Sequence, residues 1–425
     1  MSPTALAPRF FIAVVVILLF CRLVAWAIGR VGQPPVVGEM VAGVLLGPSL
    51  LGAVAPRLEH ELFPSALKPV LYIAGQIGLV AFMFQAGHEF RSHLDRSIAR
   101  AAAVVSGAGI LAPLALGALM TIGAHGRVGI FVHGVSPVVT EAFVGVALAI
   151  TAFPMLARII TERGLTGTRY GSLALASGAI DDVVAWCLLA GVLAVASGKP
   201  KPIVVAVGGI VLFALLVLYG ARPLLARTLR QGASATEAQV LIVVAVLFAA
   251  AWFTDEIGLY SVFGAFCVGM AMPRGAASER AVTTISTSNR IIFLPMFFVY
   301  SGLNTRFGLL GNRPLLVFSL FAIIVAVVGK YGACWIAARV SGQDQATALR
   351  LGALMNARGL MQLIALNVGL QAGIINSELF TALVLVALVT TLMASPALTL
   401  LDRVVPMPVR PGTPEPEAEL AVASG

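Results

Sequence analysis

Two adjacent aspartates, Asp181 and Asp182, lie in the middle of a long apolar segment. An ionisable side chain deep in such a segment costs about 3 kcal/mol or more unless it is paired or faces water, so it marks a candidate functional site. Two carboxylates this close do not both stay ionised without a counter-charge, and one of them is expected to hold a proton near neutral pH. Hard monovalent cations prefer oxygen ligands of this kind. The pair therefore predicts a site where a cation and protons compete, and there Asp182 would be the ligand of the monovalent cation.

Other apolar segments also contain polar or helix-breaking residues. Lys330 lies at mid-depth in residues 314–338, and an aspartate is its expected neutraliser. Residues 138–160 contain Thr151 and Pro154. Because Pro154 cannot donate a backbone hydrogen bond, it frees carbonyl groups in this turn that could bind a cation. Thr151 is accordingly a further candidate ion ligand.

A second interrupted helix is expected within residues 346–370. Gly359 weakens a helix there, and Asn356 and Arg358 are polar residues in an otherwise apolar run. Interrupted helices paired across a repeat mark binding sites near the membrane midplane, where half-helix ends supply partial charges. We interpret Pro154, Asn356, Arg358 and Gly359 as structural residues of two such interruptions.

The composition places these residues in a membrane protein. Of the 425 residues, 59% are hydrophobic and only 11% are charged, and the mean hydropathy is +0.98; soluble domains are about a quarter charged. A spanning helix needs about 20 mainly apolar residues. The fold class is therefore an all-α polytopic membrane protein with about thirteen transmembrane helices, predicted at 10–29, 35–52, 69–87, 100–123, 138–160, 170–197, 202–220, 237–253, 257–273, 288–303, 314–338, 346–370 and 378–401.

Loop charges predict the orientation of these helices. With the N-terminus outside, the cytoplasmic segments carry about twice as many Lys and Arg residues as the outer ones, as the positive-inside rule requires. We predict a transmembrane domain over residues 1–405 in the cytoplasmic membrane, followed by a short disordered cytoplasmic tail, 406–425. The basic residues stand singly in loops, so the net charge of +9 does not indicate nucleic-acid binding.

Two similar segment ends suggest an inverted repeat. Gly87 is followed four residues later by Arg91, and Gly302 is followed at the same spacing by Arg306, after similar Phe-rich runs. The two ends are seven predicted helices apart, and because seven is odd the matched helices run in opposite directions. Inverted repeats are common in secondary transporters, whose substrate site lies at the repeat interface.

With these motifs in view, the chain resembles the cation/proton antiporter superfamily, and within it the bacterial sodium–proton and potassium–proton exchangers of the second branch. Five stretches carry the resemblance in the order of the family: Gly38-Glu-Met-Val-Ala-Gly-Val-Leu-Leu-Gly-Pro48, Phe82-Met-Phe-Gln-Ala-Gly-His-Glu89, Thr151-Ala-Phe-Pro154, Gly178-Ala-Ile-Asp-Asp182 and Met355-Asn-Ala-Arg-Gly359.

The resemblance implies two inverted repeats that form a core domain, about 100–197 and 314–401, and a dimer domain built from the remaining helices. The two interrupted helices would cross at their unwound centres. Asp182 would be the essential cation and proton carboxylate, and Lys330 would pair with Asp181. A homodimer in a lipid bilayer is implied as well. One departure is Gln362, which stands where many relatives have a glutamate.

We therefore predict a secondary active transporter that exchanges Na⁺ or K⁺ for H⁺ by alternating access. The runner-up is a cation channel or potassium efflux protein of the same fold. An organic-anion symporter would not need adjacent aspartates, and a polytopic membrane enzyme would need catalytic residues in its loops. No catalytic triad, phosphate-binding loop or zinc motif is present in the sequence, so we expect neither an enzyme nor a bound cofactor.

Overall fold

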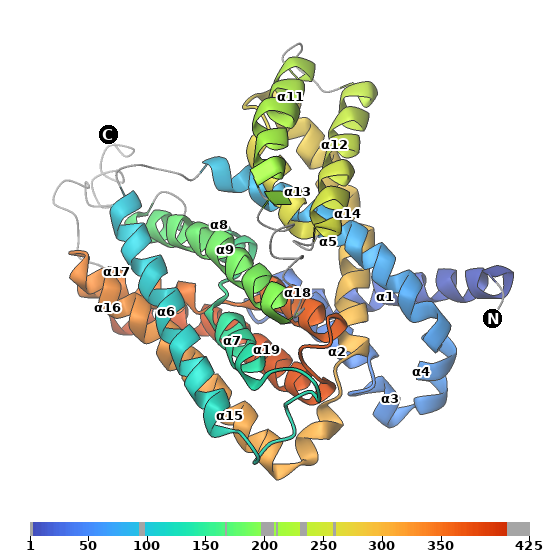
Figure 1. Ribbon diagram of the computed structural model, residues 1–425, viewed down its shortest axis with the longest axis vertical. Helices are drawn as coiled ribbons and strands as arrows, with labels where there is room; N and C mark the ends of the chain where they lie inside the picture. The colour runs from blue at the N-terminus through green and yellow to red at the C-terminus, as the bar shows by residue number, and fades with distance from the viewer. Residues whose placement is uncertain are drawn as a thin grey trace, which may run out of the picture.

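The computed structural model describes residues 3–92, 98–165, 168–196, 208–209, 211–229, 236–257 and 261–405. Helices and the connections between them make up this part of the chain, which contains no β-strand (Figure 1). Ten of its helices are long and apolar enough to cross a membrane, and two shorter apolar helices accompany them. The all-α polytopic fold is confirmed. The number thirteen stays a prediction, and the tail 406–425 lies outside the described residues.

The helices follow the predicted apolar segments closely. The first half contains α1 (Pro3–Gly29), α2 (Pro35–Leu46), the short α3 (Leu51–Val54) and α4 (Pro56–Leu62), α5 (Lys68–Ser92), α6 (Ala99–Gly123), α7 (Pro137–Ala149), α8 (Phe153–Glu162) and α9 (Arg169–Ala196). Part of the predicted helix 202–220 is outside the described residues; what is described runs from Val211 through a π-helical turn, Leu216–Ala221, into α11 (Arg222–Thr228).

The second half contains α12 (Glu237–Glu256), α13 (Ser261–Ala271), α14 (Ala276–Leu303), α15 (Arg313–Val327), α16 (Ala333–Val340), α17 (Gln345–Met355), α18 (Gly359–Gln371) and α19 (Ser377–Val404). A π-helical turn, Val328–Gly332, joins α15 to α16. Two predicted segments are therefore each divided into two helices: 138–160 into α7 and α8, and 346–370 into α17 and α18.

Local sequence signals set several helix ends. Asp344 and Asn376 cap α17 and α19 by accepting hydrogen bonds from the backbone amides of Thr347 and Leu379. Thr236 and Gln239 form a capping box at the start of α12. Pro35, Pro137 and Pro314 stand in the first turns of α2, α7 and α15, where a missing N–H costs nothing.

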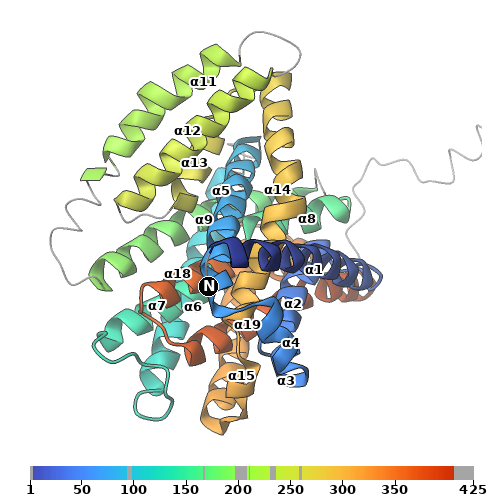
Figure 2. The same ribbon diagram turned by 90° about the vertical axis from the view of Figure 1, so that its right-hand side faces the viewer.

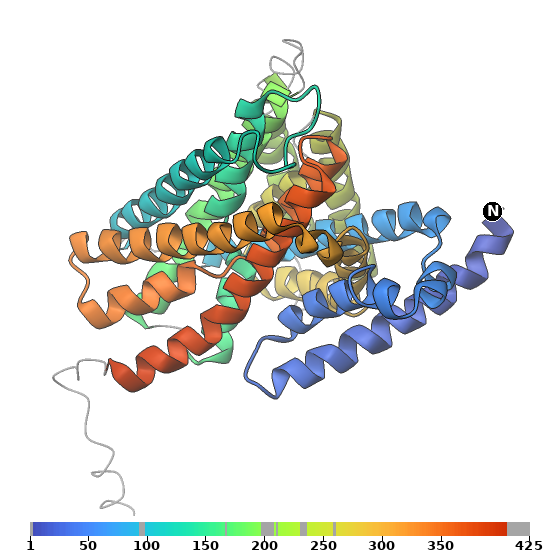
Figure 3. The ribbon, with the colours of Figure 1, turned by 90° about the horizontal axis from the view of Figure 1, so that it is seen from below.

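The helices form two groups. In one, α5 packs along α13 and α14, and α2 packs between α1 and α14; α11 and α12 stand beside α13 and α14 (Figure 2). In the other, α6 packs on α7, α9 and α16, while α15, α17 and α18 pack on α19. Viewed from below, α1 lies at the edge far from α6 and α15 (Figure 3). Large apolar side chains such as Leu19, Leu241 and Val317 are exposed on both groups, as a lipid-facing surface requires.

Glycines let the helices of the first group approach closely at two equivalent places. A Cβ atom at Gly302 of α14 would overlap the carbonyl of Gly43 of α2. A Cβ atom at Gly87 of α5 would overlap the carbonyl of Phe266 of α13, and one at Gly269 of α13 would overlap that of Phe84. The predicted repeat pairs the segment of α5 with that of α14, and the same offset of seven segments pairs 35–52, which contains α2, with 257–273, which contains α13. The α2–α14 and α5–α13 contacts are therefore the two copies of one contact, as the repeat requires.

Candidate functional site

Asp181 and Asp182 lie in the middle of α9 and are 0% and 1% exposed. Adjacent residues on a helix point about 100° apart, so the two carboxyl groups reach different neighbours. Helix α9 packs against α7, α8 and α17, which belong to the two interrupted helices. The aspartates are therefore placed beside the interruptions.

The first interruption separates α7 from α8. Helix α7 ends at Ala149, and Ile150 leaves the helix with ψ of 131°. Thr151 and Ala152 follow before α8 begins at Phe153, so Pro154 is the second residue of α8. We predicted that Pro154 itself breaks the helix; the break comes just before it, because a proline fits the first turn of a helix without losing a hydrogen bond.

The second interruption separates α17 from α18, and it meets the first. Helix α17 ends at Met355, and α18 begins at Gly359, whose φ of +57° is a conformation that favours glycine. The backbone N–H of Ala152 donates to the carbonyl of Ala357 over 3.1 Å. The N–H of Gly359 donates to Thr391 Oγ1 of α19 over 2.8 Å. The two unwound stretches thus cross in contact, as the family resemblance implied.

Asp181 is fully engaged by its neighbours. Lys330 Nζ lies 2.6 Å from Asp181 Oδ2, and both side chains are fully buried. The hydroxyl groups of Thr151 and Ser106 also donate to the carboxylate, over 2.6 Å and 2.5 Å. Lys330 makes a second hydrogen bond to the carbonyl of Ala149, again over 2.6 Å. The carboxylate and the ammonium group therefore compensate each other, and the predicted Lys330–Asp181 pair is present.

Asp182 differs from Asp181 in having no such partners. Both of its carboxylate oxygens are buried, and neither has a hydrogen-bond partner among the described residues. The backbone amide of Phe153, at the start of α8, lies close to the carboxyl group. A buried carboxyl group without a hydrogen-bond partner is costly and rare in native structures unless it binds a proton or a cation.

Arg358 is the second buried cation of the site and lies in the crossing itself. Its guanidinium group donates to the carbonyls of Leu148 and Ala326, each over 2.9 Å, and to Asn356 Oδ1 over 3.2 Å. The last carbonyls of a helix have no partner within it and carry partial negative charge. Arg358 and Lys330 together satisfy the last two carbonyls of α7, at Leu148 and Ala149. Asn356 orients Arg358, in keeping with a structural role for both.

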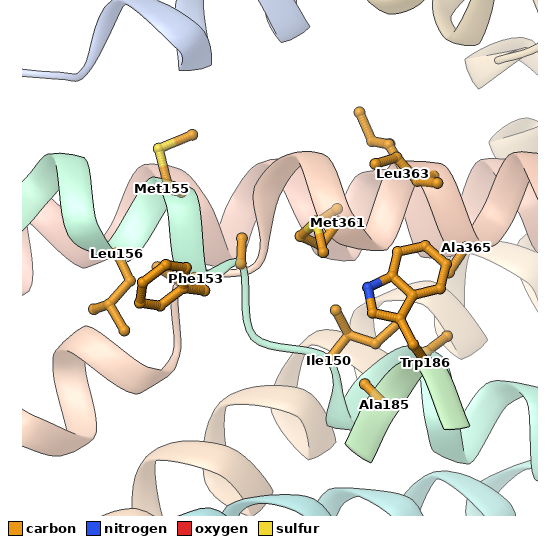
Figure 4. Packing of buried hydrophobic residues seen from close by; sticks show 14 of the residues in the cluster. Ile150, Phe153, Met155, Leu156, Ala185, Trp186, Met361, Leu363 and Ala365 are labelled. Carbon is orange, nitrogen blue, oxygen red and sulfur yellow. The ribbon is translucent and has the colours of Figure 1, made fainter. Parts of the chain in front are cut away.

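Apolar side chains fill the space around the crossing (Figure 4). Phe153 and Leu156 of α8 lie on one side of the unwound stretch, and Trp186 of α9 and Met361 of α18 lie on the other. All four are at least 93% buried. This packing keeps bulk water away from the carboxyl groups, and electrostatic interactions are stronger in such surroundings.

Sequence reasoning missed three parts of the site. Ser106 of α6 is a small polar residue in an apolar helix, and nothing in its neighbourhood marks it as a partner of Asp181. Thr391 binds the Gly359 amide from a helix far along the chain. The π-helical turn around Lys330 has no sequence signature, although such turns occur often at functional sites. Gln362 is fully buried in α18; its Nε2 lies 3.5 Å from the carbonyl of Leu383, and its Oε1 has no hydrogen-bond partner among the described residues.

The arrangement offers one paired and one unpaired carboxylate in a dry, preorganised setting. The described residues contain no group of three or more His, Cys, Asp and Glu side chains that could hold a metal ion. A cation at Asp182 would therefore complete its coordination with hydroxyl or carbonyl oxygens, which suit hard cations. The same carboxylate can bind a proton instead, so the two ligands would exclude each other.

Comparisons with known proteins find relatives over most of the chain. The family described as sodium/hydrogen exchanger, transmembrane, matches residues 15–401. The Na(+)/H(+) antiporter NhaS4 of Synechocystis is 34% identical over 397 residues, covering 90% of this chain and 94% of the relative. Cation/H(+) antiporter 17 of Arabidopsis thaliana is 32% identical over 395 residues and 92% of this chain, which spans about half (48%) of that longer relative.

The fold also has a match among solved structures. The sodium proton antiporter MjNhaP1 of Methanocaldococcus jannaschii superposes with a TM-score of 0.66 at 14% identity, covering 93% of this chain and 99% of the other. At that identity the match concerns the fold alone. Together with the family match over most of its length, these similarities show that the chain belongs to the family of transmembrane sodium/hydrogen exchangers.

Proposed function

We propose that this protein exchanges Na⁺ or K⁺ for H⁺ across the cytoplasmic membrane, with Asp182 as the group that binds the two ions in turn. The observation that carries the proposal is the buried carboxyl group of Asp182, whose two oxygens have no hydrogen-bond partner among the described residues. Only a titrating group can serve a proton and a metal cation at one place. The names of the two relatives, a sodium/proton and a cation/proton antiporter, support the same reaction.

Asp181 and Lys330 form an ion pair of no net charge beside the carboxyl group of Asp182. While their ion pair is intact, Asp181 is compensated and leaves Asp182 free for a proton or a cation. Thr151 binds Asp181 through its hydroxyl group, so in this state it supports the pair. Rotation of that hydroxyl group would turn it into a ligand of the cation at Asp182. A cation that draws Asp181 toward it would loosen the pair and change the proton affinity of Lys330.

Alternating access would use the two helix groups of the fold. The group of α6–α9 and α15–α19 is the proposed core domain, and the group of α1–α5 and α11–α14 is the proposed dimer domain. Hydrogen bonds join the two groups where they meet, such as the one from Asn367 Nδ2 of α18 to Ser301 Oγ of α14, 3.0 Å long. The core domain would move relative to the dimer domain and expose Asp182 to each side in turn. A homodimer with the N-terminus outside and the C-terminus in the cytoplasm completes the proposal.

Purified protein in proteoliposomes tests the reaction. A pH gradient is imposed and reported by a quenched fluorescent amine, and Na⁺, K⁺ or Li⁺ is added in turn. Exchange predicts fluorescence recovery that saturates with the concentration of at least one cation and depends on the pH. Lack of response to all three cations would overturn the proposal. Non-saturating cation flux that is independent of the pH gradient would indicate the runner-up, a channel of the same fold.

A further inference from the structure

A surface cavity of about 460 Å³ lies away from the ion site, where three helices of the core group begin or end. Its walls come from the N-terminal turn of α6, the N-terminal turn of α9, and the loop that follows α16. These ends lie together at the left of Figure 1. The loop charges predict that this face is cytoplasmic, so the cavity would lie at the level of the inner lipid headgroups.

Two arginines without partners line the cavity. Arg100 is the second residue of α6, and Arg169 is the first residue of α9. Both side chains are exposed, and neither has an ion pair or hydrogen bond within the described part of the chain. None of the residues that line the cavity is acidic. The nearby Asp344 is committed elsewhere, since its carboxylate accepts the amide of Thr347 at the start of α17. The cavity therefore has a strongly positive lining.

Buried polar groups without partners show that the cavity is more than a basic patch. Gln343 lines it with only 6% of its surface exposed, and its Oε1 atom is buried without a hydrogen-bond partner. The hydroxyl group of Ser341, also in the lining, is likewise buried without a hydrogen-bond partner among the described residues. Arg339 holds this loop in place by donating to the carbonyl of Gln343 over 2.8 Å. A ligand in the cavity that reached these two groups would satisfy both of them, and without a partner each costs free energy.

The chemistry of these groups defines the ligand. Two guanidinium groups and the hydroxyl of Ser341 donate hydrogen bonds, as phosphate oxygens require. The first turn of α6 adds partial positive charge, and its N-cap residue, Ile98, supplies no capping side chain. By contrast, Gln343 Oε1 can only accept. It needs a donor on the ligand, such as a hydroxyl group beside the phosphate.

The remaining lining is apolar and suits a lipid. Ile98, Val104 and Leu173 line the cavity, and Val104 of α6 is 42% exposed toward the lipid-facing surface. Basic pockets between transmembrane helices on the cytoplasmic side are places where anionic headgroups bind. We propose that this cavity binds a phosphate ester that carries a hydroxyl group, and that an anionic phospholipid of the inner leaflet supplies it. A soluble phosphate ester is the other source of the same chemistry.

Native mass spectrometry of the purified full-length protein tests this proposal with three lipids. Phosphatidylglycerol has the phosphate and the hydroxyl groups, phosphatidylmethanol has only the phosphate, and phosphatidylcholine has no net charge. We expect phosphatidylglycerol to bind best. The double variant Arg100→Gln, Arg169→Gln should bind it about tenfold less tightly, because charge-assisted hydrogen bonds are lost.

A matched control removes the same charge elsewhere. Arg227 and Arg274 are also exposed and also line a cavity, of about 570 Å³, but no buried unpartnered polar side chain is among the residues that line it. The double variant Arg227→Gln, Arg274→Gln should keep the affinity of the parent. Equal losses in both double variants would show a general charge effect and overturn the proposal.

Gln343→Leu tests the hydroxyl group independently of charge, including the case in which the arginine variants do not fold. It should lower phosphatidylglycerol binding to the level of phosphatidylmethanol and leave phosphatidylmethanol binding unchanged. Unaltered phosphatidylglycerol binding would contradict the assigned role of Gln343. Glycerol 1-phosphate distinguishes the sources: if it displaces phosphatidylglycerol at equal concentration, the cavity takes a soluble ester, and if it does not, the lipid is the ligand. None of these results depends on the ion site.

Discussion

At the scale of single residues, the two aspartates have separate tasks although they are adjacent. Asp181 accepts hydrogen bonds from Lys330, Thr151 and Ser106, whereas the oxygens of Asp182 have no such partner in the described structure. The difference follows from the 100° rotation between neighbouring helix positions. Asp181 can therefore form the buried ion pair with Lys330, while Asp182 stays available to bind a proton or a cation.

The Lys330–Asp181 pair makes a prediction for stability. Lys330→Gln leaves the carboxylate of Asp181 buried without its counter-charge, which should destabilise the protein by about 3–5 kcal/mol. The double variant Lys330→Gln, Asp181→Asn removes both charges and should recover much of the loss. Thermal unfolding of the two variants in detergent measures the difference. A single variant as stable as the parent would mean that the pair contributes no charge compensation.

At the scale of elements, the crossing depends on how the unwound backbone groups are satisfied. Arg358 and Lys330 bind the last carbonyls of α7, Thr391 binds the first amide of α18, and the two stretches bind each other through Ala152 and Ala357. An unsatisfied backbone group at this depth would cost several kcal/mol. These partners stabilise the interruptions, because they satisfy backbone groups that would otherwise be buried without a hydrogen bond.

Arg358→Ala should lower stability more than it changes ion binding. The variant loses hydrogen bonds from a charged group to two buried carbonyls, each worth about 1.5–3 kcal/mol. We expect a clearly lower unfolding temperature in detergent, with an apparent cation affinity close to that of the parent. Arg358→Lys keeps the charge but not the planar group, so its unfolding temperature should lie between those of the parent and of Arg358→Ala. A stable Arg358→Ala protein with altered affinity would place this residue in the ion path instead.

The close contact of α2 with α14 gives a second prediction at this scale. Gly302→Ala places a methyl group against the backbone carbonyl of Gly43, and such overpacking costs about 1–3 kcal/mol. Gly107→Ala is the matched control, since a Cβ atom at this position of α6 meets nothing within 4 Å. It should be neutral or stabilising by up to about 1 kcal/mol, because alanine favours a helix over glycine. Comparable unfolding temperatures for the two variants would contradict the packing described.

The sequence predicts most of the helices, but it predicts only in part where a helix is interrupted and which side chains meet at the interruption. Apolar length and loop charge predicted most helices, because lipid imposes a simple rule on spanning segments. The break near Thr151 was expected at Pro154 and lies before it, since proline restricts a helix only beyond its first turn. Ser106 and Thr391 could not be found, because a lone hydroxyl in an apolar helix acquires its partner only through tertiary packing. An aspartate partner for Lys330 could be expected, since a buried lysine needs a carboxylate, and the family resemblance implied that this partner is Asp181.

At the scale of the whole molecule, we expect exchange to respond to membrane voltage. If only Asp182 exchanged one proton for one cation, no net charge would move. A cation that disturbs the Lys330–Asp181 pair lets Lys330 release a second proton, so net charge crosses the membrane. One net charge is worth about 2.3 kcal/mol per 100 mV. Sodium-driven exchange in proteoliposomes clamped with valinomycin and potassium should therefore change its rate with voltage.

The variant Lys330→Gln separates the sources of this effect. We expect its exchange to be slower and insensitive to voltage. A parent protein that ignores voltage would show that exchange is electroneutral and that Lys330 only stabilises the core. An equal response in parent and variant would assign the extra proton to another group.

In the proposed mechanism one carboxyl group, that of Asp182, holds either a proton or a cation. The most direct test is proton release on cation binding, measured with a pH dye in weakly buffered detergent solution and without a membrane. The parent protein should release protons on addition of its transported cation, in a saturable manner. Asp182→Asn, folded as judged by size-exclusion chromatography and thermal unfolding, should release none. Cation-dependent proton release that persists in the folded Asp182→Asn protein would contradict the claim.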